Sequence, residues 1–228
     1  MPETTSATVY PERLHALRKQ TLAEADITSV QNQDLIQSRR EQICDAALEL
    51  FLEKGFAATT IRDICARSGV NQASIYDYIA NKNDILRRLL NQLWFREDVP
   101  TLSVMLQDQS VSLEDAIEQY FRECWAHKRK GTLLAYRCVP HMQAEDRHAL
   151  HAREYAAMKD LADQLSLRLG IDTEDRRLDI VSNLMVFLSA FGPMRDWLNR
   201  DIPNDLILRS VAVGAAAMVR SLVDADAK

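Results

Sequence analysis

Glycine and proline are scarce in this sequence, with six of each among 228 residues. Runs of β-branched residues, which favour sheets, are also few. Both deficits favour helices over strands. The composition, 47% hydrophobic and 27% charged, is that of a chain with enough apolar side chains for a buried core. The sequence therefore predicts an all-α protein.

Long apolar runs are missing as well. No stretch of about 18 apolar residues occurs, so we expect no membrane span. The first residues, MPETTSATVYPERLH, lack a basic start followed by an apolar core, and they predict no secretion signal. The four cysteines are scattered without a CxxC pair, which favours reduced core thiols in a cytoplasmic protein over disulfides or zinc ligands. They are Cys44, Cys65, Cys124 and Cys138.

Basic residues are not in excess. The net charge is −5, and residues 39–98 carry nine basic and nine acidic side chains, which sum to zero. A general positive field for nucleic acid is therefore absent from the sequence. A dimer with a few phosphate contacts per subunit would need only a local patch.

The most informative stretch is 59–82, which reads TTIRDICARSGVNQASIYDYIANK. Thr60 and Asp63 have the spacing of a capping box at a helix start. Gly69 permits a left-handed turn. The pattern predicts a short helix, a tight turn at Gly69 and a second short helix, which is the layout of a helix-turn-helix.

Helices also flank this stretch. An apolar stripe precedes it, and Gly55 follows as a helix end. The stripe consists of Ile43, Ala46, Ala47, Leu50 and Phe51. Asn81 with Asp84 opens a further helix over 85–95. We expect the helices to form one compact domain.

Residues 39–86 resemble the DNA-binding domain of the TetR family of bacterial transcription regulators. The resemblance is carried, in order and without a gap, by Gly55-Phe56, Thr59-Thr60-Ile61-Arg62-Asp63-Ile64, Ser68-Gly69-Val70, Ser74-Ile75-Tyr76 and Lys82. The sequence departs from the family at Ile79, often Phe or Val, and at Ala73, often Gly or Pro. The resemblance implies a three-helix DNA-binding domain at 38–84 and a helical effector-binding and dimerisation domain at 85–228.

The candidate DNA contacts fall into two groups. The resemblance assigns backbone contacts to Thr60, Tyr76 and Lys82, and Arg62 lies in the same first turn as Thr60. The base-edge candidates are Asn71, Gln72, Ala73, Ser74 and Tyr78. Glutamine can pair with adenine, and an alanine methyl can meet a thymine methyl. Alternatively, Tyr76 is a packed aromatic, Thr60 only a cap and Arg62 only solvated.

The N-terminal extension, residues 1–37, is expected to be partly flexible. One reading is a mobile arm with a fragment of helix within 11–26. The other is an arm that contacts DNA or the partner subunit through Arg13, Arg18 and Lys19.

The C-terminal half predicts a series of helices. They run from Ser112 to a stop at Gly131, over 132–138, over 144–169 with Gly170 as the end, from Thr173 to a kink at Gly192-Pro193, and from Pro203 onward. The last two carry a stripe suited to a four-helix dimer interface. The interface candidates are Val181, Leu184, Leu188, Ile207, Val211, Gly214, Ala215 and Met218. The alternative is that this stripe faces its own core.

The middle helices supply candidate walls for an effector pocket. The aromatic and apolar candidates are Trp125, Tyr136, Tyr155, Met158, Phe187 and Phe191. Arg137 or His141 could hold a carboxylate, a phosphate or a thioester-linked group. We expect an organic acid, an acyl-CoA-like molecule or a neutral lipophile as effector, although each aromatic could instead be ordinary core.

A metal site or an enzyme is not expected. His127, His141, His148 and His151 are numerous, but the sequence has no HExxH, and the segment EDRHALHARE has the pattern of a solvated surface. No G-x-S-x-G, Walker loop or paired catalytic carboxylates occur, and no cofactor is expected. The sequence thus predicts a homodimeric regulator of palindromic operator DNA, a repressor released by a small effector. The alternatives are an effector-independent DNA-binding protein of the same fold and, more distantly, a small metal-dependent enzyme.

Overall fold

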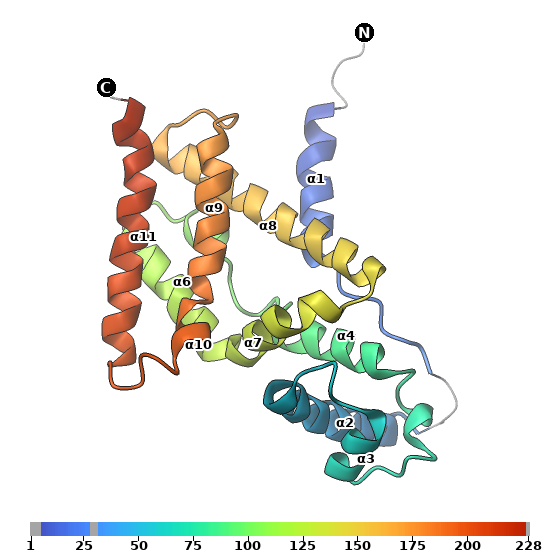
Figure 1. The fold of residues 1–228 in the computed structure, drawn as a ribbon. Coiled ribbons are helices and arrows are strands. Elements are labelled where there is room, and N and C mark those ends of the chain that lie inside the picture. The colour runs from blue at the N-terminus through green and yellow to red at the C-terminus, as the bar shows by residue number, and fades with distance from the viewer. Residues whose placement is uncertain (1–5, 28–31, 227–228) are drawn as a thin grey trace. The chain divides into compact units, whose positions relative to one another are not determined.

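The computed structural model describes residues 6–27 and 32–226, and every element in these ranges is helical (Figure 1). The prediction of an all-α protein is therefore confirmed. The α-helices are α1 (Ser6–Lys19), α2 (Gln33–Lys54), α3 (Ile61–Ser68), α4 (Lys82–Leu93), α5 (Leu102–Met105), α6 (Leu113–His127), α7 (Arg129–Cys138), α8 (Ala144–Leu169), α9 (Arg176–Ser189), α10 (Phe191–Arg195) and α11 (Asn204–Asp226). Two 3-10 helices are η1 (Ile75–Asp77) and η2 (Val139–His141). Within the described ranges, no helix is both long and apolar enough to cross a membrane.

The chain divides into two compact units by its internal contacts. Unit 1 comprises Met1–Gln20, Glu97–Arg129 and His151–Lys228, and unit 2 comprises Thr21–Arg96 and Lys130–Leu150. Unit 2 therefore holds α2, α3, α4 and most of α7. A boundary at residue 84, as expected from the sequence, would cut α4 from the helices with which it shares a core. The functional domain boundaries stay a prediction.

In unit 2, side-chain caps set the helix starts. Asn32 accepts a hydrogen bond from the Leu35 amide at 3.1 Å, so α2 begins five residues before residue 38, the expected start of the DNA-binding domain. The predicted capping box of α3 is confirmed. The Asp63 amide donates to Thr60 Oγ1 at 3.1 Å, and the Thr60 amide donates to Asp63 Oδ2 at 2.8 Å. Gly69 follows with φ 73° in the left-handed region, as the turn requires.

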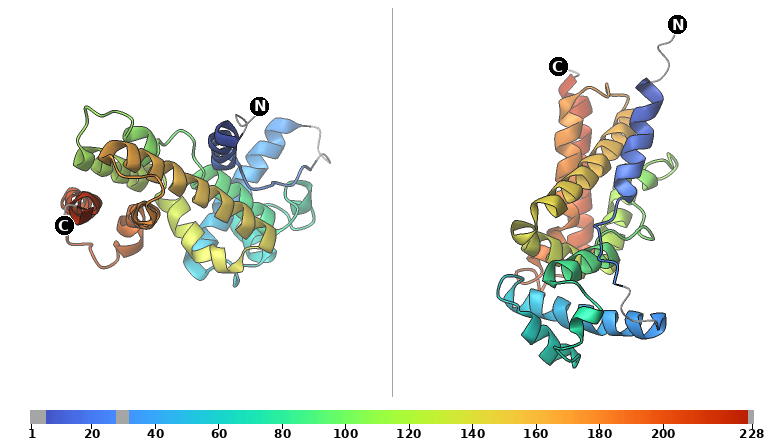
Figure 2. Two further views of the ribbon diagram at one scale, coloured as in Figure 1. Left: turned by 90° about the horizontal axis from the view of Figure 1, so that it is seen from above. Right: turned by 90° about the vertical axis from the view of Figure 1, so that its right-hand side faces the viewer.

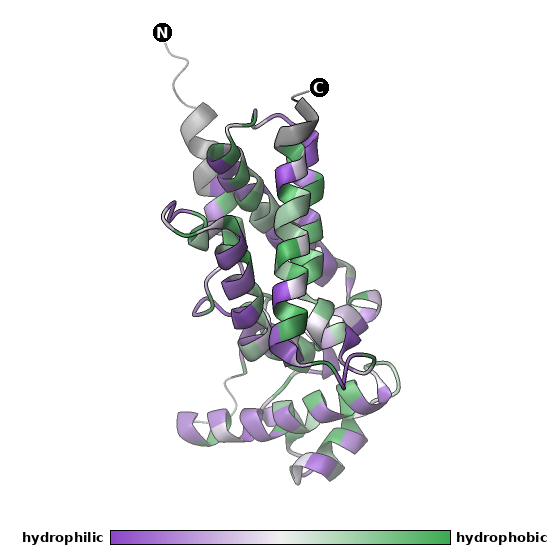
Figure 3. Cartoon of the chain, turned by 90° about the vertical axis from the view of Figure 1, so that its left-hand side faces the viewer, coloured by the Kyte–Doolittle hydropathy of each residue, from purple (hydrophilic) through white to green (hydrophobic). Residues whose placement is uncertain are grey.

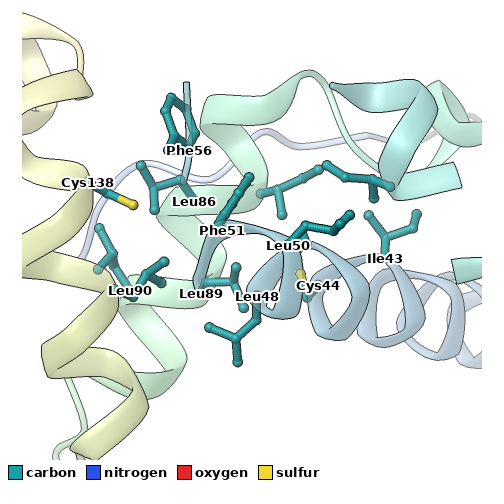
Figure 4. Packing of buried hydrophobic residues seen from close by; sticks show 14 of the residues in the cluster. Ile43, Cys44, Leu48, Leu50, Phe51, Phe56, Leu86, Leu89, Leu90 and Cys138 are labelled. Carbon is teal, nitrogen blue, oxygen red and sulfur yellow. The ribbon is translucent and has the colours of Figure 1, made fainter. Parts of the chain in front are cut away.

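The core of unit 2 joins α2 to α4 (Figure 4). Side chains of α2, α4 and α7 fill it, among them Ile43, Leu50, Phe51, Leu86, Leu89, Leu90 and Cys138. The rings of Phe51 and Phe56 meet edge to face with centroids 5.1 Å apart. All four cysteines of the chain are free and buried, as expected of core thiols. This packing fixes α3 and the turn after it on a rigid base.

Gly131 does not end a helix, and that prediction is wrong. The break falls between His127 and Arg129, and Gly131 lies inside α7. A Cβ atom on Gly131 would lie 2.3 Å from the carbonyl oxygen of Leu93. The glycine is needed because α7 passes directly against the end of α4.

In unit 1, α11 packs along α6 and α9 (Figure 2). Their shared core includes Ile117, Phe121, Leu165, Met185 and Val219. Gly170, with φ 68°, ends α8 as predicted. Helix α9 begins at Arg176 rather than at Thr173, because Asp175 accepts the Arg177 amide at 2.9 Å.

The N-terminal extension contributes α1 to unit 1. Arg18 forms an ion pair with Asp160 of α8. A contact of Arg18 with DNA or with the partner subunit stays a prediction. Arg13 and Lys19 are exposed. The expected helix fragment lies earlier than predicted, since α1 ends at Lys19.

Candidate nucleic-acid interface

The segment after Gly69 is not a regular α-helix, contrary to the prediction. Residues 72–74 form a turn, which η1 follows. Asn71 explains the difference: its side-chain oxygen accepts the Ala73 amide at 2.9 Å, and its carbonyl accepts the Ser74 hydroxyl at 3.2 Å. Such local side-chain bonds compete with helix formation. We call residues 71–78 the recognition segment.

The recognition segment has exposed polar side chains on one side and a buried isoleucine on the other. Ile75 is fully buried beneath it. Asn71, Gln72 and Ala73 are exposed, and the Tyr76 side chain is 55% exposed. An exposed tyrosine on a rigid turn can reach a nucleic acid, so the packed-aromatic alternative for Tyr76 loses support. Ser74 is half-buried.

Tyr78 differs from its neighbours. Its ring packs against the core of unit 2, and its carbonyl accepts a hydrogen bond from Arg40 Nε at 2.9 Å. This arrangement fixes the end of the recognition segment to α2. A base-reading role for Tyr78 stays a prediction.

At the start of α3, Thr60 is exposed, but its hydroxyl is already hydrogen-bonded within the chain. Its hydroxyl donates to Asp63 Oδ2 at 2.7 Å, and Lys54 pairs with the same oxygen at 2.7 Å. Bonds from Lys54 and then Thr60 hold the pKa of Asp63 well below its usual range. Arg62 is exposed and forms no hydrogen bond or ion pair with any residue that the structure describes. Arg62 is thus the guanidinium of α3 that is available to a phosphate.

Lys82 has a structural role that the sequence did not reveal. Its ammonium donates to the carbonyl oxygens of Phe56 and Thr59, both at 2.7 Å. The same nitrogen lies 4.4 Å from the centroid of the Phe56 ring, a cation–π contact. Burial lowers the pKa of Lys82. These bonds close the loop between α2 and α3, and they leave one ammonium hydrogen for a phosphate.

The predicted effector-pocket residues do not fall in one unit. Tyr136, Arg137 and His141 belong to unit 2, where Arg137 donates to the carbonyl of Leu52. The other five belong to unit 1: Trp125, Tyr155, Met158, Phe187 and Phe191. There, Trp125 lines a groove of about 590 Å³, whereas Tyr155 and Met158 line another of about 330 Å³. Phe187 is exposed and Phe191 half-buried.

Unit 1 holds a polar group that sequence reasoning missed. Burial raises the pKa of Glu154, partly offset by the charges of Arg153 and Lys128, and burial lowers the pKa of Lys128. Burial also raises the pKa of Tyr120 well above its ordinary value, and the charge of Glu154 contributes. The half-buried side chains of Glu154 and Lys128 form no hydrogen bond or ion pair within the described part of the chain.

A sequence signal for this group exists. Ile117, Phe121 and Cys124 are buried on one face of α6, and Lys128 follows at the next helical step. A lysine that continues an apolar stripe is exceptional, because unpaired charges are costly to bury.

The histidines have other partners than a metal. His148 Nδ1 lies 2.9 Å from the carbonyl oxygen of Ala144, and the His151 ring stacks on Tyr155. Among the described residues, no group of three His, Cys, Asp or Glu side chains could hold a metal ion.

Helices α9 and α11 have apolar residues on two faces, and Figure 3 shows hydrophobic colouring along α11. The exposed apolar side chains, 40–62% accessible, are Ile180, Leu184, Phe187, Leu206 and Val213; we call them the exposed stripe. Two predicted interface residues, Val181 and Ala215, are instead buried in the unit's own core. Leu184 and Gly214 are exposed, and Leu188, Ile207, Val211 and Met218 are half-buried. The dimer interface stays a prediction.

The comparisons with known proteins agree with this geometry. Residues 43–89 match the family model described as bacterial regulatory proteins, tetR family. The transcriptional regulator HbdR of Aromatoleum sp. (strain CIB) is 31% identical over 133 residues, which is 55% of each chain. The repressor KstR2 of Mycobacterium tuberculosis (strain H37Rv) is 36% identical over 55 residues, 24% of this chain and 28% of that one. The chain thus matches about half of the first relative and a smaller part of the second.

Solved structures share the fold. A tetR-family regulatory protein from Rhodococcus RHA1 aligns with a TM-score of 0.61 at 16% identity, over 79% of this chain and 96% of that one. FadR from Bacillus subtilis, solved in complex with stearoyl-CoA, aligns with a TM-score of 0.55 at 16% identity, over 78% and 96%. Residues 43–89 therefore match the TetR-family domain, and the chain as a whole shares the fold of these solved regulatory proteins.

Proposed function

We propose that this protein is a sequence-specific DNA-binding transcription regulator that acts as a homodimer in the cytoplasm. The observation that carries the proposal is the recognition segment, where exposed Gln72 and Tyr76 stand on the fully buried Ile75. A rigid polar segment of this kind suits the major groove, in which base edges can be distinguished.

The proposed binding mode divides positioning from readout. Arg62, the Tyr76 hydroxyl and the remaining hydrogen of Lys82 contact phosphates, which fix the register. Asn71, Gln72 and Ala73 face base edges. Two copies related by a two-fold axis would read the half-sites of a palindrome, and the exposed stripe of α9 and α11 is the proposed contact between the copies.

We further propose repression that a small amphipathic effector relieves. Supporting this, KstR2 is a repressor and FadR from Bacillus subtilis was solved with stearoyl-CoA. In this chain the side chains of Lys128 and Glu154 are half-buried and have no hydrogen-bond or ion-pair partner among the described residues, and desolvating a charge without a partner is costly. An effector that accepts a hydrogen bond from Lys128 and donates one to Glu154 would recover that cost.

DNA binding is tested by selection from a random duplex library with the full chain. The selected duplex is then titrated against salt with Arg62→Ala and with Lys130→Ala. Lys130 is a matched control because it is an exposed cation of unit 2 outside the proposed interface. Loss of one phosphate contact reduces the salt slope by about one, and we expect this for Arg62→Ala alone. No enriched sequence, or equal effects of the two substitutions, would contradict the proposal.

The effector is tested separately by thermal shift. We expect organic acids or CoA thioesters to raise the melting temperature of the wild-type chain, and Lys128→Met to abolish the shift. A shift that survives in Lys128→Met and in Glu154→Gln would place the effector elsewhere.

A further inference from the structure

Arg40 of α2 holds the end of the recognition segment. Its Nε atom donates a hydrogen bond to the Tyr78 carbonyl at 2.9 Å, across 38 positions of sequence. The Tyr78 amide donates to the Ile75 carbonyl at 3.0 Å, and the Tyr78 ring packs against the core of unit 2. Because the ring, the amide and the carbonyl of Tyr78 all have partners within unit 2, the guanidinium of Arg40 has a fixed place beside the recognition segment.

The bond to Tyr78 uses one of the five N–H donors of the guanidinium. The Nη1 and Nη2 atoms of Arg40 form no hydrogen bond or ion pair with any residue in the described ranges 6–27 and 32–226. The side chain is half-buried, so it is not sealed from solvent. The N–H groups of a guanidinium form a planar fork that matches two oxygens of a phosphate. Arg40 can therefore bind a phosphate without releasing Tyr78.

The ion pairs of α2, α3 and α4 leave few basic groups for phosphates. Carboxylates already pair with Lys54, Arg67, Arg87 and Arg88. Within the described part of the chain, no carboxylate pairs with Arg39, Arg40, Arg62 or Lys82. Residues 39–98 carry no net charge, so phosphate binding must depend on such unneutralised groups. Among these, Arg40 is bonded to the recognition segment itself.

We propose that Arg40 is a further phosphate contact of the DNA-binding surface. Its Nε atom keeps the bond to the Tyr78 carbonyl while the Nη groups bind one phosphate beside the recognition segment. One side chain then sets the position of that segment relative to the DNA backbone. The proposal rests on the DNA-binding function proposed above. The family-model match begins at residue 43, so Arg40 lies outside the matched domain.

The salt dependence of DNA affinity separates a phosphate contact from a purely structural role. The full chain and Arg40→Met are titrated with the duplex from the random-library selection, between about 50 and 200 mM salt. Each phosphate contact contributes about 0.9 to the slope of log affinity against log salt concentration, and we expect Arg40→Met to lose about that much. If Arg40 only holds Tyr78, the variant loses the same factor of affinity at every salt concentration, and an unchanged slope would overturn the proposal.

Two further variants complete the design. Arg40→Lys keeps the charge and should keep the slope of the wild type. Arg137→Met is the matched control: Arg137 also belongs to unit 2 and also donates to a backbone carbonyl, that of Leu52, but it lies on α7, which carries none of the proposed DNA contacts. Its slope should equal that of the wild type. Thermal denaturation without DNA checks that each variant is folded, and Arg40→Gln takes the place of Arg40→Met if the latter is not.

Neutral methylphosphonates, placed one at a time in the backbone of the selected duplex, locate the contact. At one position in each half-site the neutral group should weaken binding of the wild type but not of Arg40→Met. Equal effects on both proteins at every position would overturn the role of Arg40 alone. A wild-type chain that binds no duplex would overturn the proposed function as well.

Discussion

Asn91 and Leu22, 69 positions apart in the sequence, form two hydrogen bonds with each other. The side-chain amide of Asn91 pairs with the backbone amide and carbonyl of Leu22, as the backbone of a neighbouring β-strand would. Asn91 Nδ2 also donates to Glu24 at 2.9 Å. The asparagine side chain carries both a donor and an acceptor, so it can pair with the carbonyl and the amide of one peptide residue. Aspartate lacks the donor, and leucine lacks both. The pairing fixes the extension that precedes the helix-turn-helix on α4.

Asn91→Ala should destabilise the protein, because it leaves the amide and carbonyl of Leu22 without partners. We expect a loss of about 2–3 kcal/mol in the free energy of unfolding, measured by urea denaturation. Gln92→Ala is the control, since Gln92 is exposed on the same helix. Equal midpoints for the two variants would show that the pairing contributes nothing to stability.

Lys82→Met should lower stability as well as DNA affinity. The substitution keeps an unbranched chain but leaves the carbonyl oxygens of Phe56 and Thr59 without the ammonium. We expect a loss of about 2–3 kcal/mol, since hydrogen bonds to a charged group are among the stronger ones. Thermal denaturation without DNA is the measurement, and Lys130→Met is its control. An unchanged melting temperature would leave Lys82 as a phosphate contact alone.

Glu154→Gln should stabilise the protein in a pH-dependent way. Burial raises the pKa of Glu154 above its ordinary value of 4.5. Below that value the group is protonated in the folded and unfolded states, whereas above its folded pKa the buried charge costs stability. The melting temperature of the variant should exceed that of the wild type at about pH 8, and the gain should shrink as the pH falls towards 4.5.

Glu174→Gln provides the control for this titration, because Glu174 is an exposed carboxylate of the same unit. A gain that is independent of pH, or equal in both variants, would mean that the buried charge of Glu154 does not limit stability.

Charge placed on the exposed stripe should dissociate the proposed dimer. Ile180→Glu and Val213→Glu add carboxylates to α9 and α11, and either one would be desolvated without a partner in a two-fold interface. Sedimentation velocity should report a dimer for the wild type and a monomer for each variant. Leu167→Glu, at an apolar position on α8 that is 71% exposed, should remain dimeric. A monomeric wild-type chain would remove the stripe's proposed role.

Much of the fold follows from short-range sequence signals. Caps are local, so Thr60 with Asp63, Asn81 and Gly170 could be placed from their neighbours alone. The role of Gly131 could not be predicted from its neighbours. It depends on the close approach of α4, where the carbonyl of Leu93, 38 residues earlier in the chain, leaves no room for a side chain. The start of α9 could not be placed either, because Thr173 and Asp175 are both possible caps. In the structure Asp175 is the cap, since its side chain accepts the Arg177 amide.

The exposed positions of Gln72 and Tyr76 agree with the helix-turn-helix motif, whereas their contacts with DNA stay predictions. Features that depend on long-range contacts could not be predicted. The partners of Lys82 come from a loop more than 20 residues earlier. The polar group of Lys128 and Glu154 requires two helices to meet. On α9 and α11 the sequence does not distinguish core positions from surface positions. Apolar and small side chains occur at both.

A substitution of Gln72 tests most directly whether the recognition segment reads base edges. Affinities of wild type and Gln72→Ala are measured for the selected operator and for every single-base-pair substitution in it. We expect Gln72→Ala to remove the preference at one base pair in each half-site, a preference of about 1–3 kcal/mol, and to leave the other positions unchanged. An equal loss of affinity at every position would contradict it.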